Sequence, residues 1–483
     1  MAEPLWTIDA LVAACGGEAD GMRSAADDGV TGISIDTRTL APGDMFVALK
    51  DQRDGHEFVS AAFEKGAVAA LVSASYARKS GDGLLIRVGD VLAALERIGA
   101  AARARLSSEA RVIAVTGSAG KTTTKEMLRL CLSELGATHA SDKSFNNHWG
   151  VPLTLARMPA ATRYGVFEIG MNHAGEITPL VALVRPHVAV VTTVVAAHLE
   201  HFGTEEAIAD AKAEIFSGLE PGGVAVVPGD NTHFRRLQKA ALARPGSRIH
   251  VFSGRLPSED EMMQKPAARH EWTYLRWSTT VDGQTLVHTT GGEFPLGLVG
   301  HHNVMNAIAV LCTLKAVGAD AGRAMRALAT MAPPRGRGSR ARVAMGDGAV
   351  LLIDESYNAN PASMRAALLA MAGLDRALHP RRIAVLGDML ELGPKARELH
   401  EGLAEAIAEA GIDRIFCAGE NMKYLFDRVP TDRQAYWAPT SSGLMASLRD
   451  ALRAGDAVMI KGSNGSRMGL LVEMVSGLGA RAA

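Results

Sequence analysis

The segment of residues 112–127 constrains the fold of this chain most strongly, because it has the order strand, glycine-rich turn and helix. Its apolar start, residues 112–115, predicts a buried strand. Gly117 and Gly120 then allow a tight turn whose backbone N–H groups can converge on an anion, and the following helix would direct its positive end at the same point. The segment therefore predicts a phosphate-binding site where the helix begins.

Lys121 and Thr122 extend this prediction to a nucleoside triphosphate with its metal ion. Lys121 would supply charge at the β- and γ-phosphates, and Thr122 would offer its hydroxyl to Mg²⁺. The turn is shorter than the usual form of the motif, because only Ser118 and Ala119 separate the two glycines. A surface lysine after a plain glycine turn is the alternative, but the complete strand, turn and Lys-Thr combination favours the triphosphate.

Composition narrows the class of protein. A chain of 483 residues exceeds the size at which one hydrophobic core stops growing, so two to four domains are expected. Lysine and arginine total 51 against 52 acidic residues, which argues against chain-wide attraction to nucleic acid or membrane. The four scattered cysteines suit buried positions in a reducing cytosol. Without a signal-peptide pattern or a long apolar stretch, we expect a soluble, cytoplasmic protein that does not insert into membranes.

Strand and helix patterns alternate along the chain and predict an α/β fold with three domains. The first domain shows β-type runs at 45–49 and 69–72 with a helix at 58–65 between them. A helix at 90–106 then leads to the phosphate loop. We expect boundaries near Val88 and within the proline- and glycine-rich loop 333–339, which gives domains of residues 1–88, 89–336 and 337–483.

The sequence patterns of the central and C-terminal domains predict parallel sheets covered by helices. Continuous β-branched runs of the central domain predict strands at 164–169, 188–195 and 223–227. Residues 271–298 instead suggest antiparallel hairpins, and 303–317 a helix. The C-terminal domain looks Rossmann-like, with strands predicted at 350–353, 382–386, 415–418 and 457–460.

Polar residues at the ends of these strands are candidates for chemistry, because ligands of parallel sheets bind at the carboxyl ends of strands. Glu168 lies inside an apolar strand, just before residues 170–173, and His198 follows the next strand, where a metal bound to a triphosphate would lie. A carboxylate paired with an arginine and a loop histidine are the alternatives. Lys212 lies among apolar residues on a helix, and it is either a solvated surface charge or a desolvated amine.

Two segments of the C-terminal domain also follow strands. Residues 354–363 are dense in Asp, Asn, Tyr and Ser, and residues 461–467 contain Lys, Gly, Ser and Arg. Both could face an anionic ligand. A capped turn into a helix that begins near Pro361 and a plain Gly/Ser loop are the alternatives.

These elements, in this order, resemble the Mur ligase family, the ATP-dependent amide-forming enzymes of peptidoglycan synthesis. The short loop 116–123 is the form found in that family, and segments 146–152, 168–173 and 302–306 are similar to its adenine-side, metal-carboxylate and His-Asn-x-x-Asn motifs. His148 and Trp149 depart from the family pattern and receive no role. The resemblance implies nucleotide contacts from Gly117, Ser118, Ala119, Gly120, Lys121, Thr122, Thr123, Asn146, Asn147, His302, Asn303, Asn306, Arg337, Asp354, Asn358 and Asn360.

The resemblance also implies the metal and catalytic residues. Two Mg²⁺ ions would be held by Thr122, Glu168, His198 and a carbamylated Lys212. Lys121, Lys212, His198, Glu168 and the hinge arginine Arg337 would be catalytic. The third domain would close on ATP by a hinge near residues 334–339 and carry Asp354, Asn358 and Asn360 toward it.

Within the family, segments 354–364, 385–393 and 461–468 resemble the members that add D-alanyl-D-alanine to UDP-N-acetylmuramoyl-tripeptide. We therefore expect these two small molecules as substrates of a monomer that does not bind nucleic acid. Ligases of the diaminopimelate-adding, cyanophycin or folylpolyglutamate type, and a P-loop switch that makes no bond, are the alternatives. The uridine-nucleotide pocket would be formed by Ser34, Asp36, Thr37, Arg38, Phe46, Ala48, Asp54, Gly55 and His56.

Overall fold

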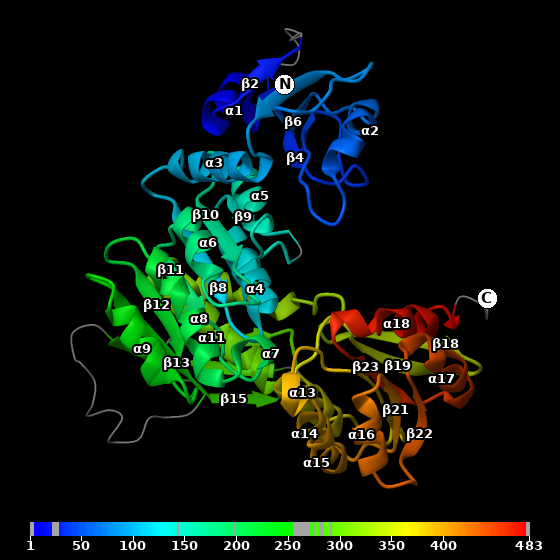
Figure 1. Ribbon diagram of the computed structural model, residues 1–483. Helices are drawn as coiled ribbons and strands as arrows, with labels where there is room; N and C mark the ends of the chain where they lie inside the picture. The colour runs from blue at the N-terminus through cyan, green and yellow to red at the C-terminus, as the bar shows by residue number, and fades with distance from the viewer. Residues whose placement is uncertain are drawn as a thin grey trace.

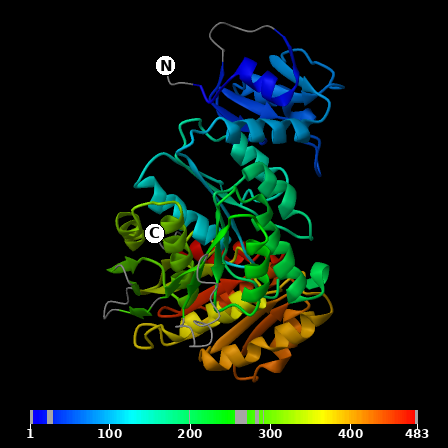
Figure 2. The same ribbon diagram turned by 90° about the vertical axis from the view of Figure 1, so that its left-hand side faces the viewer.

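The computed structural model describes residues 4–21, 29–142, 144–197, 199–254, 270–274, 276–279, 285–289 and 292–479. Three α/β bodies follow one another along the chain, and in both views the central body lies between the other two (Figures 1 and 2). Each body is built around its own sheet of mainly parallel strands. The predicted fold class, three α/β domains, is confirmed, whereas the residue at which each domain begins stays a prediction.

The N-terminal body holds a five-stranded sheet of order β2-β7-β6-β5-β4, in which only β2 is antiparallel to its neighbour. A separate strand pair, β1 and β3, lies beside it. The strands are β1 Trp6–Thr7, β2 Glu18–Asp20, β3 Gly29–Val30, β4 Gly32–Ser34, β5 Asp44–Val47, β6 Ala69–Ser73 and β7 Leu84–Val88. The helices are α1 Ile8–Cys15, η1 Gly55–Phe58 and α2 Val59–Glu64, and α3 Val91–Ala104 follows β7 and packs against both α1 and the central body.

The central body holds a seven-stranded, wholly parallel sheet of order β14-β13-β12-β11-β8-β10-β9, and a three-stranded antiparallel sheet β15-β16-β17. Its strands are β8 Arg111–Thr116, β9 Thr138–Ala140, β10 Tyr164–Glu168, β11 Val188–Val191, β12 Val224–Pro228, β13 Arg248–Ser253, β14 His270–Tyr274, β15 Arg276–Thr279, β16 Thr285–Thr289 and β17 Gly292–Leu296. Its helices are α4 Lys121–Ser133, α5 Gly150–Ala156, α6 Ile177–Val184, α7 Leu199–Phe202, α8 Glu205–Ala213, η2 Glu214–Gly218, α9 Phe234–Leu242, α11 His301–Ala316, α12 Ala321–Met325 and η3 Arg326–Thr330.

Both faces of the large central sheet are buried, which explains the continuous apolar runs of its strands. Ala114 and Val191 face one core, which α5, α6, α8 and α9 cover. Ile113 and Val190 face the other, which α4 and α11 cover. Because successive side chains alternate between the faces, each strand needs apolar residues at every position.

The C-terminal body holds a six-stranded sheet of order β18-β19-β23-β20-β21-β22, parallel except for the pairing of β18 with β19. Its strands are β18 Ser339–Met345, β19 Gly348–Glu355, β20 Arg382–Gly387, β21 Arg414–Ala418, β22 Gln434–Ala438 and β23 Ala457–Lys461. Its helices are α13 Pro361–Ala372, η4 Gly393–Lys395, α14 Ala396–Glu401, α15 Leu403–Glu409, α16 Met422–Arg428, η5 Ser441–Leu444, α17 Met445–Ala451, η6 Asn464–Ser466 and α18 Gly469–Ser476.

Two expectations about strands need correction. The run 188–195 is a strand only to Val191, because the chain then leaves the sheet and passes over the phosphate loop, where Thr193 O accepts from Ser118 N–H. Residues 271–298 form antiparallel hairpins only from β15 onward. The preceding β14 pairs in parallel with β13 and extends the central sheet.

The N-terminal and central bodies meet at α3 and α5. The Trp6 indole N–H donates to Ala156 O at 2.8 Å, and the Arg157 guanidinium donates to Ile33 O at 2.6 Å. Arg105 lies 3.6 Å over the Trp6 ring and donates to the carbonyls of Leu5 and Met158. Arginine and indole donors thus fasten the bodies together, largely through backbone carbonyls.

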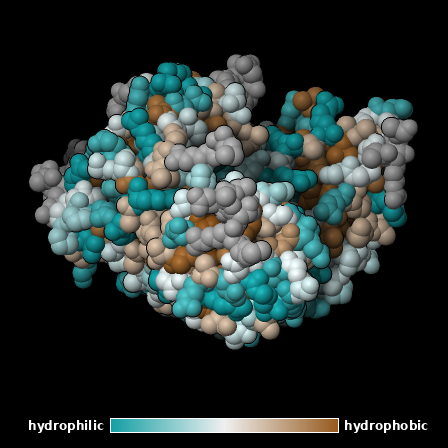
Figure 3. All heavy atoms as spheres, turned by 90° about the horizontal axis from the view of Figure 1, so that it is seen from above, coloured by the Kyte–Doolittle hydropathy of each residue, from teal (hydrophilic) through white to brown (hydrophobic). Residues whose placement is uncertain are grey.

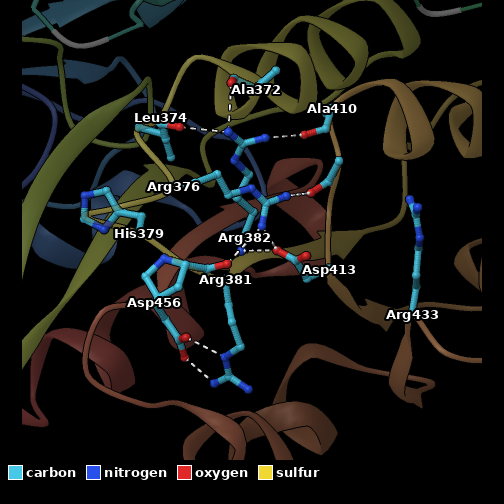
Figure 4. Close-up of polar contacts among 12 residues, drawn as sticks. Ala372, Leu374, Arg376, His379, Arg381, Arg382, Ala410, Asp413, Arg433 and Asp456 are labelled. Atoms are coloured by element: carbon cyan, nitrogen blue, oxygen red, sulfur yellow. Dashed lines mark hydrogen bonds and ion pairs between the residues drawn. The ribbon is translucent and has the colours of Figure 1, made fainter.

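A cluster of arginines and aspartates braces the edge of the C-terminal sheet at which β20 and β23 begin (Figure 4). Arg382 donates to the carbonyls of Ala372, Leu374 and Ala410, at the ends of two helices. Arg381 makes two bonds of 2.7 and 2.6 Å to the carboxylate of Asp456, which is 1% exposed. These side chains join strands to helices on the side of the sheet where strands start.

The surface seen from above carries hydrophilic and hydrophobic residues intermingled (Figure 3). Within the described part of the chain, no helix is long and apolar enough to cross a membrane. The four cysteines are buried and unpaired, as the sequence predicts.

Candidate active site

A cavity of about 720 Å³ lies between the central and C-terminal bodies. The central body contributes the phosphate loop, the ends of β10 and β11 and the start of α11. The C-terminal body contributes the segments after β19, β20 and β23 and one face of α13. Carboxyl ends of strands from two sheets therefore line one cavity, which is where parallel sheets bind ligands.

The phosphate loop is held in shape by close packing on both sides. A Cβ on Gly117, whose φ is 151°, would collide with the Thr192 hydroxyl. A Cβ on Gly120, whose φ is 83°, would lie 2.5 Å from Asn306 Oδ1 on α11. The Ser118 hydroxyl donates to Val195 O at 2.9 Å. The short spacing of the glycines thus fits a loop clamped between α11 and the chain after β11.

Lys121 is the first residue of α4, and its ammonium donates to Gly117 O at 2.5 Å across the loop. Desolvation lowers the pKa of Lys121. The charge of Arg337 lowers this pKa further, whereas the charge of Glu168 raises it. A polyphosphate bound at the start of α4 would supply the missing negative charge. The electrostatics of the loop therefore favour an anion.

Glu168 ends β10 and is almost fully buried, and none of the described arginines pairs with it. Its two carboxylate oxygens accept from the Thr122 hydroxyl at 2.8 Å and from the Asn146 amide at 2.8 Å. Thr122, Asn146 and Glu168 all line the cavity. Hydroxyl and carboxylate oxygens are ligands that Mg²⁺ prefers, so this pair fits a metal that is also bound by phosphates.

Lys212 is 2% exposed on α8, so its amine is desolvated and is not a solvated surface charge. No hydrogen bond or ion pair joins its amine to another described residue. Burial lowers the pKa of Lys212 well below its ordinary value, and the nearby charge of Lys121 adds to the effect. His198, the predicted second metal residue, lies outside the described residues.

The residues predicted to contact the nucleotide divide into two groups. His302, Asn303 and Asn306 line the cavity from α11, and desolvation lowers the pKa of His302 against the opposing charge of Glu355. Thr123 also lines it. Asn147 does not, because its side chain accepts from Gly150 N–H and helps to start α5.

Arg337 and Tyr357 join the C-terminal body to the central one. The Arg337 guanidinium lies 4.2 Å from the centre of the Tyr357 ring, and the Tyr357 hydroxyl donates to the Ser144 hydroxyl at 2.7 Å. Farther along, Glu200 N–H donates to Glu391 O at 3.0 Å. These contacts hold the two walls of the cavity together.

Asn358 and Asn360, which follow β19, line the cavity, whereas Asp354, the last but one residue of β19, does not. The Asp354 carboxylate accepts from Gly336 N–H at 2.9 Å and from the Ser356 hydroxyl at 2.6 Å. It therefore fixes the loop that carries Arg337. The predicted hinge and the segment after β19 are one hydrogen-bonded unit.

Sequence reasoning gave no individual role to Glu355, Lys461, Tyr357 or Ser144. Lys461 is 3% exposed, and its ammonium donates to Asn358 O at 3.0 Å and to Glu355 at 3.3 Å. Desolvation lowers the pKa of Lys461, and Glu355 opposes it. The two residues are register partners at the ends of β19 and β23, a pairing that strand-end position alone could have suggested.

The predicted uridine-nucleotide residues lie in the N-terminal body and do not line this cavity. Asp54 accepts from the His56 ring at 2.7 Å, and the same ring accepts from Ser73 N–H at 2.9 Å. A Cβ on Gly55 would lie 2.5 Å from Leu49 O, so the turn requires glycine.

The remaining members of this group form a second small cluster. Asp36 binds the largely exposed Arg38 at 2.7 Å, the Ser34 hydroxyl donates to Asp36 O, and Thr37 O accepts from Lys65. Phe46 and Ala48 are buried in the core beside them. Arg38 leaves most of its guanidinium open to solvent.

Comparison with known proteins agrees with this arrangement. Residues 115–314 match the Mur ligase middle domain, and residues 336–464 match the Mur ligase, glutamate ligase domain. The chain is 38% identical over 405 residues to the UDP-N-acetylmuramoyl-tripeptide–D-alanyl-D-alanine ligase of Escherichia coli, a match that covers 83% of this chain and 84% of the relative. It is 32% identical to the enzyme of that name from Bacillus subtilis, covering 92% and 93%.

A crystal structure of MurF from Acinetobacter baumannii superposes with a TM-score of 0.80 at 29% identity, and the match covers 98% of this chain and 99% of that one. Both the sequence matches and the three-body architecture therefore agree with the cavity's chemistry. The chain belongs to the Mur ligase family, among the members named as D-alanyl-D-alanine ligases.

Proposed function

We propose that this protein is the ATP-dependent ligase that joins D-alanyl-D-alanine to UDP-N-acetylmuramoyl-tripeptide. One observation carries the proposal: a single cavity brings together the phosphate loop, the Thr122–Glu168 pair and a separate wall from the C-terminal body. The relatives named for this reaction cover nearly the whole chain. A phosphoryl donor and an amine acceptor can thus meet from opposite walls.

In this reaction the terminal carboxylate of the tripeptide attacks the γ-phosphorus of ATP, and ADP leaves. The amine of D-alanyl-D-alanine then attacks the carbonyl carbon of the acyl phosphate. The new C–N bond forms, the C–O bond to phosphate breaks, and the amine releases its proton. Lys121 and Arg337 would stabilise the charge that spreads over the transferring phosphoryl group.

For the metal ions, we propose that Thr122 and Glu168 hold one Mg²⁺ and that His198 and a carbamate on Lys212 help to hold a second. Bound Mg²⁺ would neutralise phosphate charge during transfer. A neutral lysine amine can add to CO₂, which converts a cation into an oxygen ligand suited to a hard metal. The burial and lowered pKa of Lys212 support this assignment.

The test of the carbamate uses Lys212→Ala beside Lys239→Ala, an exposed lysine on α9. We expect Lys212→Ala to lose activity, and wild-type activity to fall when bicarbonate and CO₂ are removed and to return when bicarbonate is added. Full activity of Lys212→Ala, or indifference of the wild type to bicarbonate, would contradict the assignment.

The overall activity is tested by phosphate release with ATP against a small matrix of UDP-muramyl peptides and amines. We expect release only when UDP-N-acetylmuramoyl-tripeptide and D-alanyl-D-alanine are both present. Release triggered by a single amino acid would favour a diaminopimelate-adding or glutamate-adding ligase. ATP binding without amine-stimulated release would favour a nucleotide switch.

We further propose a cytoplasmic monomer whose domains are residues 1–88, 89–336 and 337–483, in which the third domain closes on ATP. Asn358, Arg337 and the α11 residues would contact the nucleotide, and the N-terminal body would bind the uridine nucleotide near Arg38 and His56. Light scattering should give the mass of one chain. X-ray scattering should show compaction with an ATP analogue and the UDP substrate; unchanged dimensions would contradict closure.

A further inference from the structure

A second cavity, of about 500 Å³, adjoins the first one beside the hinge. The two cavities share the lining residues Thr122, Ser144, Arg337 and Tyr357. Thr122 and Arg337 are the residues for which we propose metal and phosphate contacts, so the second cavity begins where the γ-phosphate of ATP would lie. The proposed function gives no role to the rest of its wall, which α4 and the chain between η3 and the hinge form.

One face of α4 leads from the phosphate loop into this cavity. Thr122, Lys125 and Arg129 are spaced by three and four residues, so their side chains follow one another along that face. Lys125 is fully buried, and its ammonium donates to Ser141 O at 2.6 Å. The Arg129 side chain is half-exposed. Positive charge therefore continues along α4 from its phosphate end toward solvent.

Among the described residues that line the cavity, Glu126 supplies the one carboxylate. It accepts from Arg129 Nε at 2.7 Å and lies 2.6 Å from the ammonium of Lys125. Burial raises the pKa of Glu126, but these two contacts outweigh burial and hold the pKa below its ordinary value. With Arg335 and Arg337, four cations face this one anion. The wall thus attracts a negative ligand, while the carboxylate weakens the hold that four cations would otherwise have.

Arg335 lines the same cavity from the hinge. Its side chain is exposed and forms no hydrogen bond or ion pair with another described residue. The turn that carries it is fixed, because Arg337 N–H donates to Pro334 O at 3.0 Å and Gly336 N–H donates to the Asp354 carboxylate at 2.9 Å. The Arg335 guanidinium is therefore available to an oxyanion, a ligand that its donors suit well.

The Tyr357–Ser144 hydrogen bond lies where the two cavities adjoin, because both residues line both cavities. The Tyr357 ring packs under Arg337, and a Cβ on Gly336 would lie 2.8 Å from Tyr357 Cβ. Tyr357 is 37% exposed, so its ring can turn without a change in the backbone. One side-chain hydrogen bond thus stands between the site of phosphoryl transfer and the second cavity.

We propose that the second cavity is the route by which inorganic phosphate leaves the ligase, an inference that rests on the proposed function. Phosphate forms between ADP, on the side of the phosphate loop and α11, and the new amide, so the two larger products enclose it. The second cavity begins beside that point, and its cations suit a tetrahedral oxyanion. Phosphate passes Tyr357, follows Lys125 and Arg129 along α4, and reaches solvent at Arg335.

The experiment separates the formation of phosphate from its release during the first turnover. Acid quench measures total phosphate and a fluorescent phosphate sensor measures free phosphate, with ATP and both proposed substrates present. In Arg335→Ala and Arg129→Gln we expect unchanged formation, and release slower by roughly threefold in each and about tenfold in the double variant, because a charged cleft speeds the passage of counter-ions by at least that factor. Arg326→Ala is the matched control, since Arg326 is an exposed arginine of η3 that lines neither cavity.

A second variant tests the route by size instead of charge. Ala332 is exposed and lines the second cavity, so Ala332→Trp should obstruct the cavity without disturbing a core. We expect free phosphate to lag behind total phosphate in this variant as well, with an unchanged melting temperature.

Two results would overturn the route while leaving the proposed function intact. One is release that keeps pace with formation in both Arg335→Ala and Ala332→Trp. The other is unchanged release together with a higher KM of Arg335→Ala for a UDP-tripeptide that ends in diaminopimelate but not for one that ends in lysine. That result would assign the cavity to an acidic group of the peptide. If the wild type forms no phosphate that depends on D-alanyl-D-alanine, the proposed function itself fails, and the route fails with it.

Discussion

In the parallel sheets, the side at which strands begin (the starting edge) and the side at which they end (the finishing edge) use the same polar residue types for opposite purposes. At the starting edge of the C-terminal sheet, Arg381 binds the Asp456 carboxylate, and Arg382 donates to carbonyls at the ends of helices (Figure 4). At the finishing edge of the central sheet, Lys121 reaches only a carbonyl of its own loop among the described residues, and the buried Lys212, which lies near enough for its charge to interact with that of Lys121, has no partner among them. Mostly paired polar groups brace the fold, although the buried Arg382 Nε has no partner among the described residues, whereas unpaired groups at the finishing edge indicate where ligands are expected.

Helix direction explains part of this difference. In a parallel α/β sheet each helix begins at the finishing edge of a strand, so α4 and α13 present free N–H groups there. Helices end at the starting edge, where carbonyls need donors, and arginine supplies several at once. The chain therefore places arginine braces at one edge and leaves anion-seeking groups at the other.

The largest predicted contrast comes from Lys121→Ala at the finishing edge. Loss of the ammonium should lower kcat on the order of 10³-fold, because phosphoryl transfer depends on charge compensation. The melting temperature should not fall, since desolvation already disfavours this charge. Steady-state phosphate release and thermal unfolding measure the two effects, with Lys239→Ala as control. A variant that keeps a tenth of wild-type activity would contradict the prediction that Lys121 at the finishing edge serves the reaction.

Asp456→Asn at the starting edge should show the reverse. Its carboxylate binds Arg381 twice and accepts from Arg453 N–H at 2.7 Å, so removing the charge should cost about 3 kcal/mol of unfolding free energy. The activity of the folded variant should be unchanged. Denaturant unfolding with Asp450→Asn, a 76% exposed carboxylate, as control tests this. A stable but inactive Asp456→Asn would mean that both edges serve the reaction.

His187 extends the comparison to the starting edge of the central sheet. Its ring accepts from Val112 N–H at 2.9 Å, and burial, together with Arg103 and Arg111, lowers the pKa of His187 to about 4. Between its ordinary pKa of about 6.5 and about 4, the unfolded chain binds the proton and the folded chain does not. Stability should therefore fall as the pH drops through this range, by up to about 3 kcal/mol.

The measurement is chemical unfolding of the wild type and of His187→Gln from about pH 7 to about pH 4. The variant should lose this part of the pH dependence, although it starts from a lower stability. Equal slopes in the two proteins would show that His187 does not brace the sheet through a neutral ring.

The smallest predicted effect concerns the Tyr357–Ser144 hydrogen bond, which joins two finishing edges. Tyr357→Phe keeps the ring under Arg337 but removes the hydroxyl, which should cost about 1 kcal/mol of closure. We expect KM values to rise roughly fivefold with little change in kcat. Ser144→Ala should match it, and the double variant should be no worse than either single one. Additive losses would show that the two hydroxyls do not act through their shared hydrogen bond.

Local patterns predicted much of the fold and the core of the site. The phosphate loop, the burial of most strands and the start of α13 depend on residues that are neighbours in sequence, so spacing and propensity suffice. The closeness of Asn306 to Gly120, the Tyr357–Ser144 bond and the Arg382–Ala410 bond depend on residues 28 to 213 positions apart. No periodicity reports such pairs, and the parallel pairing of β14 was missed for the same reason.

The junction between the N-terminal and central bodies carries an evolutionary consequence. Arg105, Arg157 and Trp6 bind the backbone carbonyls of Leu5, Met158, Ile33 and Ala156, and a carbonyl is the same whichever side chain accompanies it. Such an attachment places few demands on the residues that supply those carbonyls. The side chains at these positions can therefore change without loss of the junction, so the N-terminal body, for which we propose uridine-nucleotide binding, can vary while the two bodies that form the cavity stay as they are.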